Sequence, residues 1–292
     1  MDSTLSRILC IGALHLDHTI QCIGDPALGE SNPANTTKSY GGVAFNISRL
    51  LSQLECISGL ASRLGADRAG ADIIDHLGTT QIRQVDIGTE LDGHTATYTA
   101  IIDAQGGLII GLADMKIYDL LDDQYWSNRI DNLRDWDAWC LDTNLPESGL
   151  RYLMSQKNRP RLYVVASSPT KALRLKSLLQ DIDTLILNIS EATMITRQSP
   201  EGADAAKIAA QWLCTAGVDR TIVTHGGRGA AWADASGTGI IDSFLRNQDM
   251  VRTSGAGDTL AAVTIAALER GLSTSQALKF GILASHHFMR RS

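Results

Sequence analysis

The chain has 292 residues, of which 44% are hydrophobic and 20% are charged. This composition can bury the core of one large α/β domain, with or without an appendage, and it excludes fibrous and disordered proteins. The 32 acidic and 26 basic side chains give a net charge of -6 without a basic cluster. This charge pattern argues against a nucleic-acid partner and favours small molecules as ligands.

The five cysteines are scattered and form no CxxC pair, which indicates reduced thiols inside a cell and neither a disulfide framework nor a zinc site. The first residues lack the charged and long apolar regions of a signal peptide, and no segment reaches the length of a membrane span. We therefore expect a cytoplasmic protein without a membrane partner.

Short apolar runs alternate with helical patterns along most of the chain. This rhythm is typical of βαβ units, so we expect an α/β fold with a doubly wound, mostly parallel sheet flanked by helices. Ligands of such sheets bind at the carboxyl ends of the strands. The runs that we expect to form strands are "RILCIGAL" (7–14), "CISGLA" (56–61), "AWCLDTN" (138–144), "RLYVVASS" (161–168), "TLILNIS" (184–190) and "RTIVTHG" (220–226).

Two segments interrupt this rhythm, because residues 18–40 and 93–112 carry strand-like alternation and turn residues without a helix between them. The second segment is typical of a β-hairpin with "DAQGG" (103–107) as its turn. We expect both segments to form a small β-sheet that acts as a lid over the strand ends. Residues 1–17, 41–92 and 113–292 would then form the α/β core.

Polar residues and glycines follow the first expected strand. Asp17 would lie at the carboxyl end of that strand, where it could bind sugar hydroxyls or simply serve as a turn or cap residue. Gly41 and Gly42 precede a helix, and Asn46 lies in the first turns of that helix. Asparagine is a poor residue inside helices, so Asn46 is expected to face solvent or to bind a ligand.

Two later strand ends carry further candidates. Asn188 and Glu191 follow an apolar strand at a spacing that suits either a hydrated Mg²⁺ ion or a helix cap. A glycine-rich turn follows the next strand and could bind nucleotide phosphates or form a tight hairpin. The Walker pattern and the dinucleotide pattern GxGxxG are absent. The residues of the glycine-rich turn are Thr224, Gly226, Gly227 and Gly229.

The stretch "GAGD" (255–258) precedes the long apolar run "TLAAVTIAAL" (259–268), which ends before Gly271. The run predicts a buried helix with Asp258 in its first turn. The small residues Gly255, Ala256 and Gly257 leave backbone N–H groups open at the helix start, a place that attracts anions. Asp258 alone could also be just a favourable first-turn residue.

In this order, the motifs resemble those of the ribokinase-like (PfkB) carbohydrate kinase family over nearly the whole chain. The matching features are Asp17, the double glycine with Asn46, NxxE at Asn188 to Glu191, TxGxxG from Thr224 to Gly229, and GAGD ending at Asp258. The resemblance implies a kinase that uses ATP and Mg²⁺ on a small nucleoside or sugar. It further implies that Asp258 is the catalytic base and that the N–H groups of residues 255–257 bind the transferred phosphoryl group. We expect the helix start to keep Asp258 ionised.

Further segments resemble those of the family members that phosphorylate pseudouridine at its 5′-hydroxyl. They are "ESNPANTTKSYGGVAFNIS" (30–48), "GLADMKIYDLL" (111–121) and "SSPTKALRL" (167–175). By this resemblance Ser31, Asn32, Met115 and Lys171 contact the substrate, and we expect Ser31, Asn32 and Lys171 to converge with Asp17 and Asn46 at the strand ends. Met115 could instead fill the core and Lys171 could be a solvated helix residue.

Two departures from the family pattern concern ions and the nucleotide. Many members carry an acidic residue where this chain has Arg252, and the chain ends at "ASHHFMRRS" (284–292), earlier than its relatives. The alternatives to a pseudouridine-phosphorylating enzyme are a kinase for ribose, a hexose or adenosine, and a catalytically weak relative that binds a nucleoside. An exposed lid edge could also pair with the lid of a second copy to form a homodimer.

Overall fold

The computed structural model describes residues 5–243 and 255–290. Its main body is a nine-stranded sheet in which β1, β4, β5 and β8–β11 run parallel, β12 is antiparallel to β11, and β13 is antiparallel to β12. The strand order is β13 (Gly237–Ile241), β12 (Ala230–Asp234), β11 (Arg220–Thr224), β10 (Thr184–Asn188), β9 (Arg161–Val165), β8 (Ala138–Asp142), β1 (Arg7–Ile11), β4 (Ile57–Gly65) and β5 (Arg83–Glu90).

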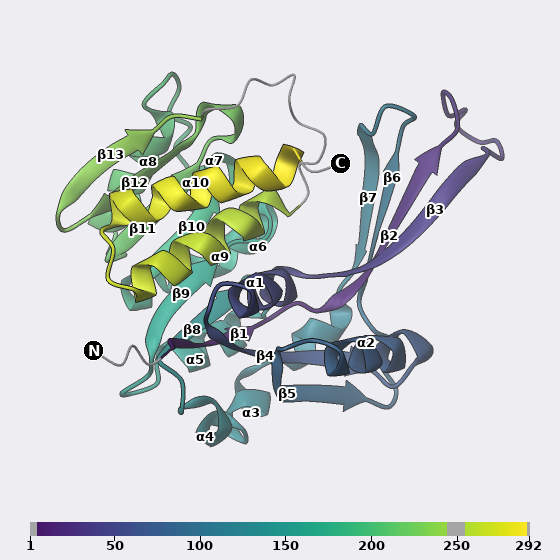
Figure 1. Cartoon of the computed structure of the whole chain (residues 1–292), viewed down its shortest axis with the longest axis horizontal. Helices are drawn as coiled ribbons and strands as arrows, with labels where there is room; N and C mark the ends of the chain where they lie inside the picture. The colour runs from purple at the N-terminus through teal and green to yellow at the C-terminus, as the bar shows by residue number, and fades with distance from the viewer. Residues whose placement is uncertain (1–4, 244–254, 291–292) are drawn as a thin grey trace.

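Helices cover both faces of this sheet (Figure 1). The first face carries α1 (Val43–Ser52), α2 (Arg68–Gly78), α9 (Ala256–Glu269) and α10 (Thr274–Arg290). The second carries α3 (Asp123–Ser127), α4 (Ile130–Leu133), α5 (Glu147–Met154), α6 (Pro169–Ala172), α7 (Ile189–Thr196) and α8 (Ala205–Thr215). Short 3₁₀ turns complete the described elements: η1 (Lys116–Leu120), η2 (Leu173–Leu175), η3 (Leu179–Asp181) and η4 (Gly226–Arg228).

Strand β1 shows why an apolar run of this kind lies inside the sheet. Ile8 and Cys10 pack into the cluster under α1 and α9, whereas Leu9 and Ile11 pack into the cluster under α3–α8. Successive side chains of a strand point to opposite faces, so a strand that is covered on both faces is apolar throughout. The predicted doubly wound fold is confirmed. Within the described residues, no helix is both long and apolar enough to span a membrane.

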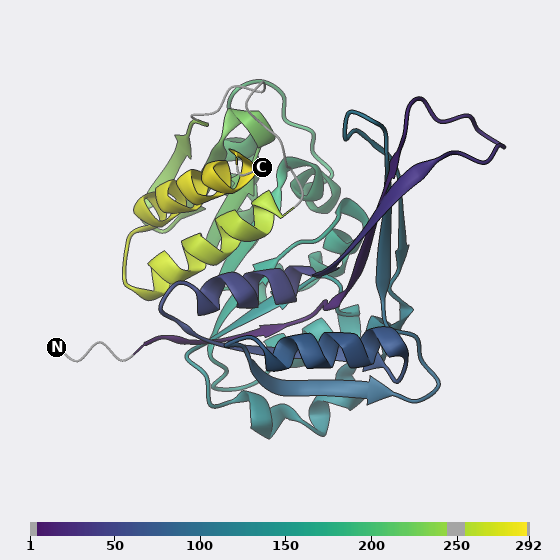
Figure 2. The ribbon, with the colours of Figure 1, turned by 45° about the vertical axis from the view of Figure 1, so that its right-hand side comes forward.

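A second, four-stranded sheet projects from the main body (Figures 1 and 2). Its strand order is β3 (Ala34–Gly41), β2 (His15–Cys22), β6 (Thr97–Ile102) and β7 (Leu108–Asp114). The hairpin predicted around residues 103–107 is confirmed, because β6 and β7 pair antiparallel and Gly107 O accepts from Asp103 N at 2.8 Å. The division of the chain into core and lid remains a proposal.

The second sheet begins earlier in the chain than expected. Strand β1 ends at Ile11, and β2 already starts at His15. Asp17 therefore lies within β2, opposite Ser39 of β3, and not at the carboxyl end of the first strand. Only residues 12–14 separate the two strands. Strand β2 therefore begins next to the carboxyl end of β1 and carries Asp17 away from the main sheet.

Candidate active site

Asn46 and Asp258 meet between the starts of two helices. The amide Nδ2 of Asn46, on α1, donates to Oδ2 of Asp258, on α9, at 2.7 Å. Asp258 is in the first turn of α9, as its position before the apolar run predicts, and Gly271 follows the helix end with φ of 82°. Two residues 212 positions apart in the chain are thus brought into direct contact.

The pKa of Asp258 is raised to about 6, mainly because burial removes water from its carboxyl group. The hydrogen bond from Asn46 and the nearby His15 lower this pKa, whereas Asp142 and Asp17 raise it. Part of the residue remains exposed, but the atoms packed around the carboxyl group outweigh the helix start that we expected to keep it ionised. The carboxylate is therefore the main form above about pH 6.

The start of α9 presents backbone donors beside this carboxylate. Gly255 is the N-cap residue with φ of 85°, a left-handed conformation that favours glycine, and no described side chain caps the helix. Gly257 is exposed, and a Cβ atom built there meets none of the described atoms within 4 Å. Among residues 5–243 and 255–290, nothing occupies the first-turn N–H groups of Ala256 and Gly257, and such groups at a helix N-terminus favour an anion.

Gly41 and Gly42 are both glycines because a Cβ atom at either position would clash with a neighbouring atom. A Cβ atom on Gly41 would lie 2.0 Å from Oδ2 of Asp17, and one on Gly42 would lie 2.3 Å from the carbonyl oxygen of Ala13. Gly42 also has φ of 109° and is the N-cap residue of α1. The pair lets β3 pass directly against Asp17 and then turn into the helix that carries Asn46.

Asp142, at the end of β8, is a buried carboxylate that the sequence analysis did not select. Its Oδ2 accepts from Ala13 N at 2.8 Å and from Ala44 N at 3.0 Å, and its Oδ1 accepts from Asn144 N at 2.7 Å. The side chain therefore ties the turn after β1 to the first turn of α1. The available signal was an acidic residue at the end of the apolar run "AWCLD", similar to the acidic residue after the first run that singled out Asp17.

Lys171 lies on α6, beside the loop that follows β8. Its Nζ donates to Oδ1 of Asn144 at 2.5 Å. Burial lowers the pKa of Lys171, Arg174 lowers it further, and Asp142 opposes the change. Lys171 is therefore not a solvated helix residue, and it lies near the carboxyl end of β8.

Met115 is partly buried against the core cluster beneath η1. This position fits the alternative expectation that Met115 fills the core.

Ser31 and Asn32 lie in the exposed loop between β2 and β3. The side chain of Asn32 closes this loop, because it accepts from Ala27 N at 2.8 Å and donates to Ala27 O at 2.9 Å. Cys22 ends β2 five residues beyond Asp17, which corresponds to roughly 16 Å of strand. The structure does not bring these two residues together with Asp17 and Asn46.

The NxxE motif forms a helix cap at the start of α7. Oδ1 of Asn188 accepts from Glu191 N at 3.0 Å, and Oε2 of Glu191 accepts from Asn188 N at 2.7 Å. This is the capping alternative of the sequence analysis. Burial raises the pKa of Glu191. Within the described residues, no group of three or more His, Cys, Asp or Glu side chains could hold a metal ion.

The TxGxxG stretch forms the turn between β11 and β12. Thr224 ends β11 opposite Ala230, and His225 N donates to Gly229 O at 2.8 Å. A Cβ atom on Gly229 would lie 2.1 Å from the carbonyl oxygen of Ile241 on β13. Gly226 and Gly227 lie in η4. This is the hairpin alternative, and it places Thr224 beside Asn188 at the carboxyl ends of paired strands. Arg252 lies outside the described residues.

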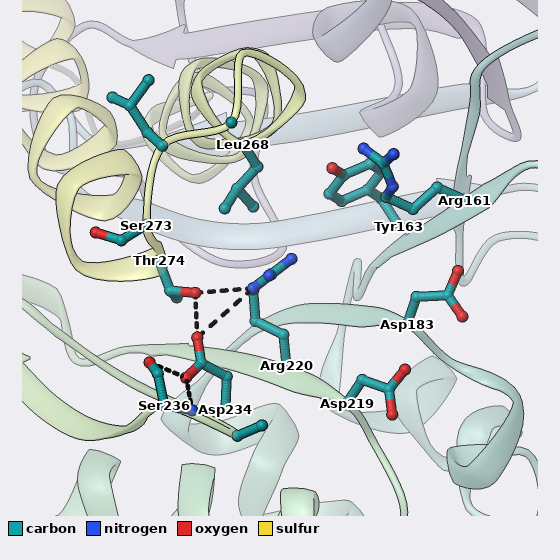
Figure 3. A pocket seen from close by; sticks show the side chains of 13 residues that line it. Arg161, Tyr163, Asp183, Asp219, Arg220, Asp234, Ser236, Leu268, Ser273 and Thr274 are labelled. Atoms are coloured by element: carbon teal, nitrogen blue, oxygen red, sulfur yellow. Dashed lines mark hydrogen bonds and ion pairs between the residues drawn. The ribbon is translucent and has the colours of Figure 1, made fainter.

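A pocket of about 740 Å³ lies at the opposite, amino ends of β9–β11 (Figure 3). Several of its polar groups are bound by one another or by neighbouring residues: Arg220 Nε donates to Thr274 Oγ1 at 2.8 Å, Thr274 donates to Asp234, and Arg161 pairs with the adjacent Glu269 at 2.6 Å. None of the sequence-predicted site residues lines this pocket. We therefore place the candidate active site at the Asn46–Asp258 contact.

Comparisons with known proteins identify the family. The sequence profile described as pfkB family carbohydrate kinase matches residues 6–287. The chain is similar to pseudouridine kinase from Escherichia coli K12, with 24% identity covering 94% of this chain and 87% of that protein. It is also similar to guanosine-inosine kinase from Exiguobacterium acetylicum, with 24% identity covering 95% and 92% of the two chains.

Solved structures share the fold. A carbohydrate kinase from Agrobacterium tumefaciens superposes with a TM-score of 0.85 and 29% identity, covering 99% of this chain and 92% of that chain. A ribokinase II-type protein from Escherichia coli, in complex with ATP and Mg²⁺, superposes with a TM-score of 0.81 and 18% identity, covering 99% and 94%. Kinases of this family transfer a phosphoryl group to a hydroxyl group. With a profile match over nearly its whole length, this chain belongs to the pfkB family of carbohydrate kinases.

Proposed function

We propose that this protein transfers the γ-phosphoryl group of ATP to the 5′-hydroxyl of a nucleoside, and that the nucleoside is pseudouridine. The observation that carries the kinase reaction is the contact of Asn46 with Asp258 beside the open N-terminus of α9. A carboxylate beside backbone N–H groups that no described residue caps suits a reaction that removes a proton from an alcohol and stabilises phosphoryl charge.

In the proposed reaction, the 5′-oxygen forms a bond to the γ-phosphorus while the bond between that phosphorus and the bridging oxygen breaks, and ADP leaves. The hydroxyl proton passes to Asp258, and Asn46 holds the carboxylate that accepts it. The N–H groups of Ala256 and Gly257 stabilise the charge on the transferred group. Little basicity is needed, because the transition state is loose and the nucleophile loses its proton late.

Mg²⁺ would neutralise phosphate charge when bound with the nucleotide. The cap of α7 uses the side-chain oxygen of Asn188 and Oε2 of Glu191, so Oε1 of Glu191 is the oxygen that would hold the ion, directly or through bound water. Thr224, Gly226, Gly227 and Gly229 lie next to them and remain our candidates for nucleotide binding.

The choice of pseudouridine is supported by the similarity to pseudouridine kinase and by the half-buried Lys171 near the strand ends. The equal identity to guanosine-inosine kinase keeps purine nucleosides as the alternative. Asp17 and Asn46 would bind the ribose hydroxyls in either case. We also propose that the protein is cytoplasmic.

We expect pseudouridine to be phosphorylated with a kcat/KM at least about tenfold above that of uridine, which one or two base-edge hydrogen bonds can supply. The measurement is a phosphorylation assay with ATP and Mg²⁺ on pseudouridine, uridine, adenosine, guanosine, ribose and fructose 6-phosphate. Equal rates with ribose would contradict the nucleoside assignment. Binding without turnover of any acceptor would instead support a nucleoside-binding relative.

We further propose that the second sheet forms a homodimer contact. Strand β7 is an edge strand, and its apolar side chains Leu108, Ile109, Ile110 and Leu112 are 44–62% exposed. Exposed apolar edge strands are ready sites for pairing with another copy. Ile110→Lys is expected to convert a dimer into a monomer in light-scattering measurements, whereas Thr36→Lys on the other edge is not. A wild-type monomer at assay concentration would refute this contact.

A further inference from the structure

His15 lies directly behind Asp17 on strand β2. Its ring atom Nε2 lies 3.0 Å from Oδ1 of Asp17. The two residues share one face of the strand because they are two positions apart. The His15 side chain is only 11% exposed, whereas the Asp17 side chain is 30% exposed. His15 is therefore placed to act on a ligand through Asp17 and not by contact of its own.

The partners of His15 determine which ring nitrogen carries the proton. The hydroxyl of Tyr118 donates to Leu14 O at 2.7 Å and accepts from Leu14 N at 2.9 Å. Its single proton is committed, so it offers His15 Nδ1, at 3.5 Å, only a lone pair. An ionised Asp17 can only accept. The Nε2 atom must therefore carry a proton and donate it to Asp17.

This contact fixes the orientation of the Asp17 carboxylate. Oδ1 is held by His15, and Oδ2 lies so close to Gly41 that a Cβ atom there would be 2.0 Å away. Rotation of the carboxylate would break the first contact. At the neighbouring Asp258, the hydrogen bond from Asn46 and His15 lower the pKa, whereas Asp142 and Asp17 raise it.

We propose that His15 is a positioning residue that sets the affinity for the acceptor by holding Asp17 in one orientation through its Nε2–H group. This inference rests on the proposed function, in which Asp17 binds the acceptor's hydroxyl groups. Preorganised groups bind more tightly because less order must be imposed when the ligand arrives. The effect therefore falls on acceptor binding and not on the phosphoryl-transfer step.

The test compares three variants with the acceptor that the wild-type enzyme phosphorylates best. His15→Asn removes the donor that reaches Asp17 and is expected to raise the acceptor KM at least about tenfold, the effect of one hydrogen bond to a charged group. At pH 8, well above the pKa of about 6 of Asp258, which His15 helps to lower, its kcat and its KM for ATP should change less than about threefold. His15→Gln places an amide donor near the position of Nε2 and should restore the acceptor KM to within about threefold.

His18→Asn is the matched control, because His18 lies on the opposite face of the same strand and should leave the acceptor KM unchanged. Thermal unfolding of all variants checks that they are folded. An unchanged acceptor KM in His15→Asn would overturn the proposal. So would parallel losses in kcat and in ATP affinity that His15→Gln does not restore, since these indicate a general structural role.

A second measurement separates this inference from the proposed function. Long-range ¹H–¹⁵N correlation spectra of histidine-labelled protein report which ring nitrogen is protonated. We expect a protonated Nε2 in His15 of the wild type and a changed Nε2 signal in Asp17→Asn. An unprotonated Nε2, or a signal that does not respond to Asp17→Asn, would refute the contact even if no acceptor were phosphorylated. A failure of the substrate panel alone would refute only the proposed function.

Discussion

Asp258→Asn is expected to lower kcat by at least about 10² to 10³, the usual effect of losing a general base. Asparagine keeps the shape of the side chain but cannot take the hydroxyl proton. The KM values should change little, because the open N–H groups of Ala256 and Gly257 remain in place. Steady-state kinetics at pH 8 make this measurement. Asp131→Asn, which alters a side chain that is 95% exposed, is the control and should behave as the wild type.

The pH dependence of kcat/KM tests the role of Asp258 as the base in a second way. The pKa of Asp258 is raised to about 6, so kcat/KM of the wild type should be level above that value and fall about tenfold per pH unit below it. Asp258→Asn should lack this acid limb. Turnover of the variant near the wild-type level would remove Asp258 from the role of base.

The raised pKa of Asp258 also predicts in which direction the stability of the fold changes with pH. The folded state holds the Asp258 proton more tightly than the unfolded chain does, so this group stabilises the fold at low pH. That contribution is lost as the pH rises from about 4 to about 6. The ionised form above pH 6 is therefore destabilising, and Asp258→Asn should be at least as stable as the wild type at pH 8. Active sites commonly carry such a cost.

The parts of the fold that follow from local patterns could be predicted from the sequence. Apolar runs marked six of the nine strands of the main sheet, whereas β5, β12 and β13 were not among the runs expected to form strands. The small residues before "TLAAVTIAAL" marked the start of α9 with Asp258 in its first turn. The hairpin at residues 103–107 was also predicted, since turn residues and alternation are local signals. These features depend on neighbours within one helix or strand.

Contacts between distant segments could not be predicted in this way. The role of Asp142 depends on β8 lying beside β1, an order that no local pattern contains. Ser31 and Asn32 were expected beside Asp17, but β2 and β3 continue for five further pairs beyond it. The cap at Asn188 and Glu191 was one of two local alternatives, and the backbone contacts of both side chains distinguish it. The resemblance to a family predicted the overall fold, but it did not predict Asp142 or the distance of Ser31 and Asn32 from Asp17.

Asp142→Ala is expected to lower the free energy of unfolding by about 3–5 kcal/mol, because it removes the acceptor of three N–H groups near the core and each unpaired buried donor costs about 1–3 kcal/mol. Asp142 itself is 1% exposed. The affected donors are Ala13, Ala44 and Asn144. Urea denaturation of the variant, with Asp131→Ala as the exposed control, makes the measurement. An equal stability of the two variants would mean that water satisfies these donors.

Asp142→Asn separates the charge of Asp142 from its hydrogen bonds. Its amide oxygen can still accept from Ala13 and Ala44, so the stability loss should be smaller than in Asp142→Ala. Loss of the negative charge removes one of the groups that raise the pKa of Asp258, and the acid limb of kcat/KM should therefore move to lower pH. A limb at the wild-type position would mean that the charge of Asp142 does not contribute to the pKa of Asp258. A limb that moves down in Asp142→Asn but not in Asp131→Asn would show that the buried carboxylate after β8 raises the basicity of the residue that takes the proton.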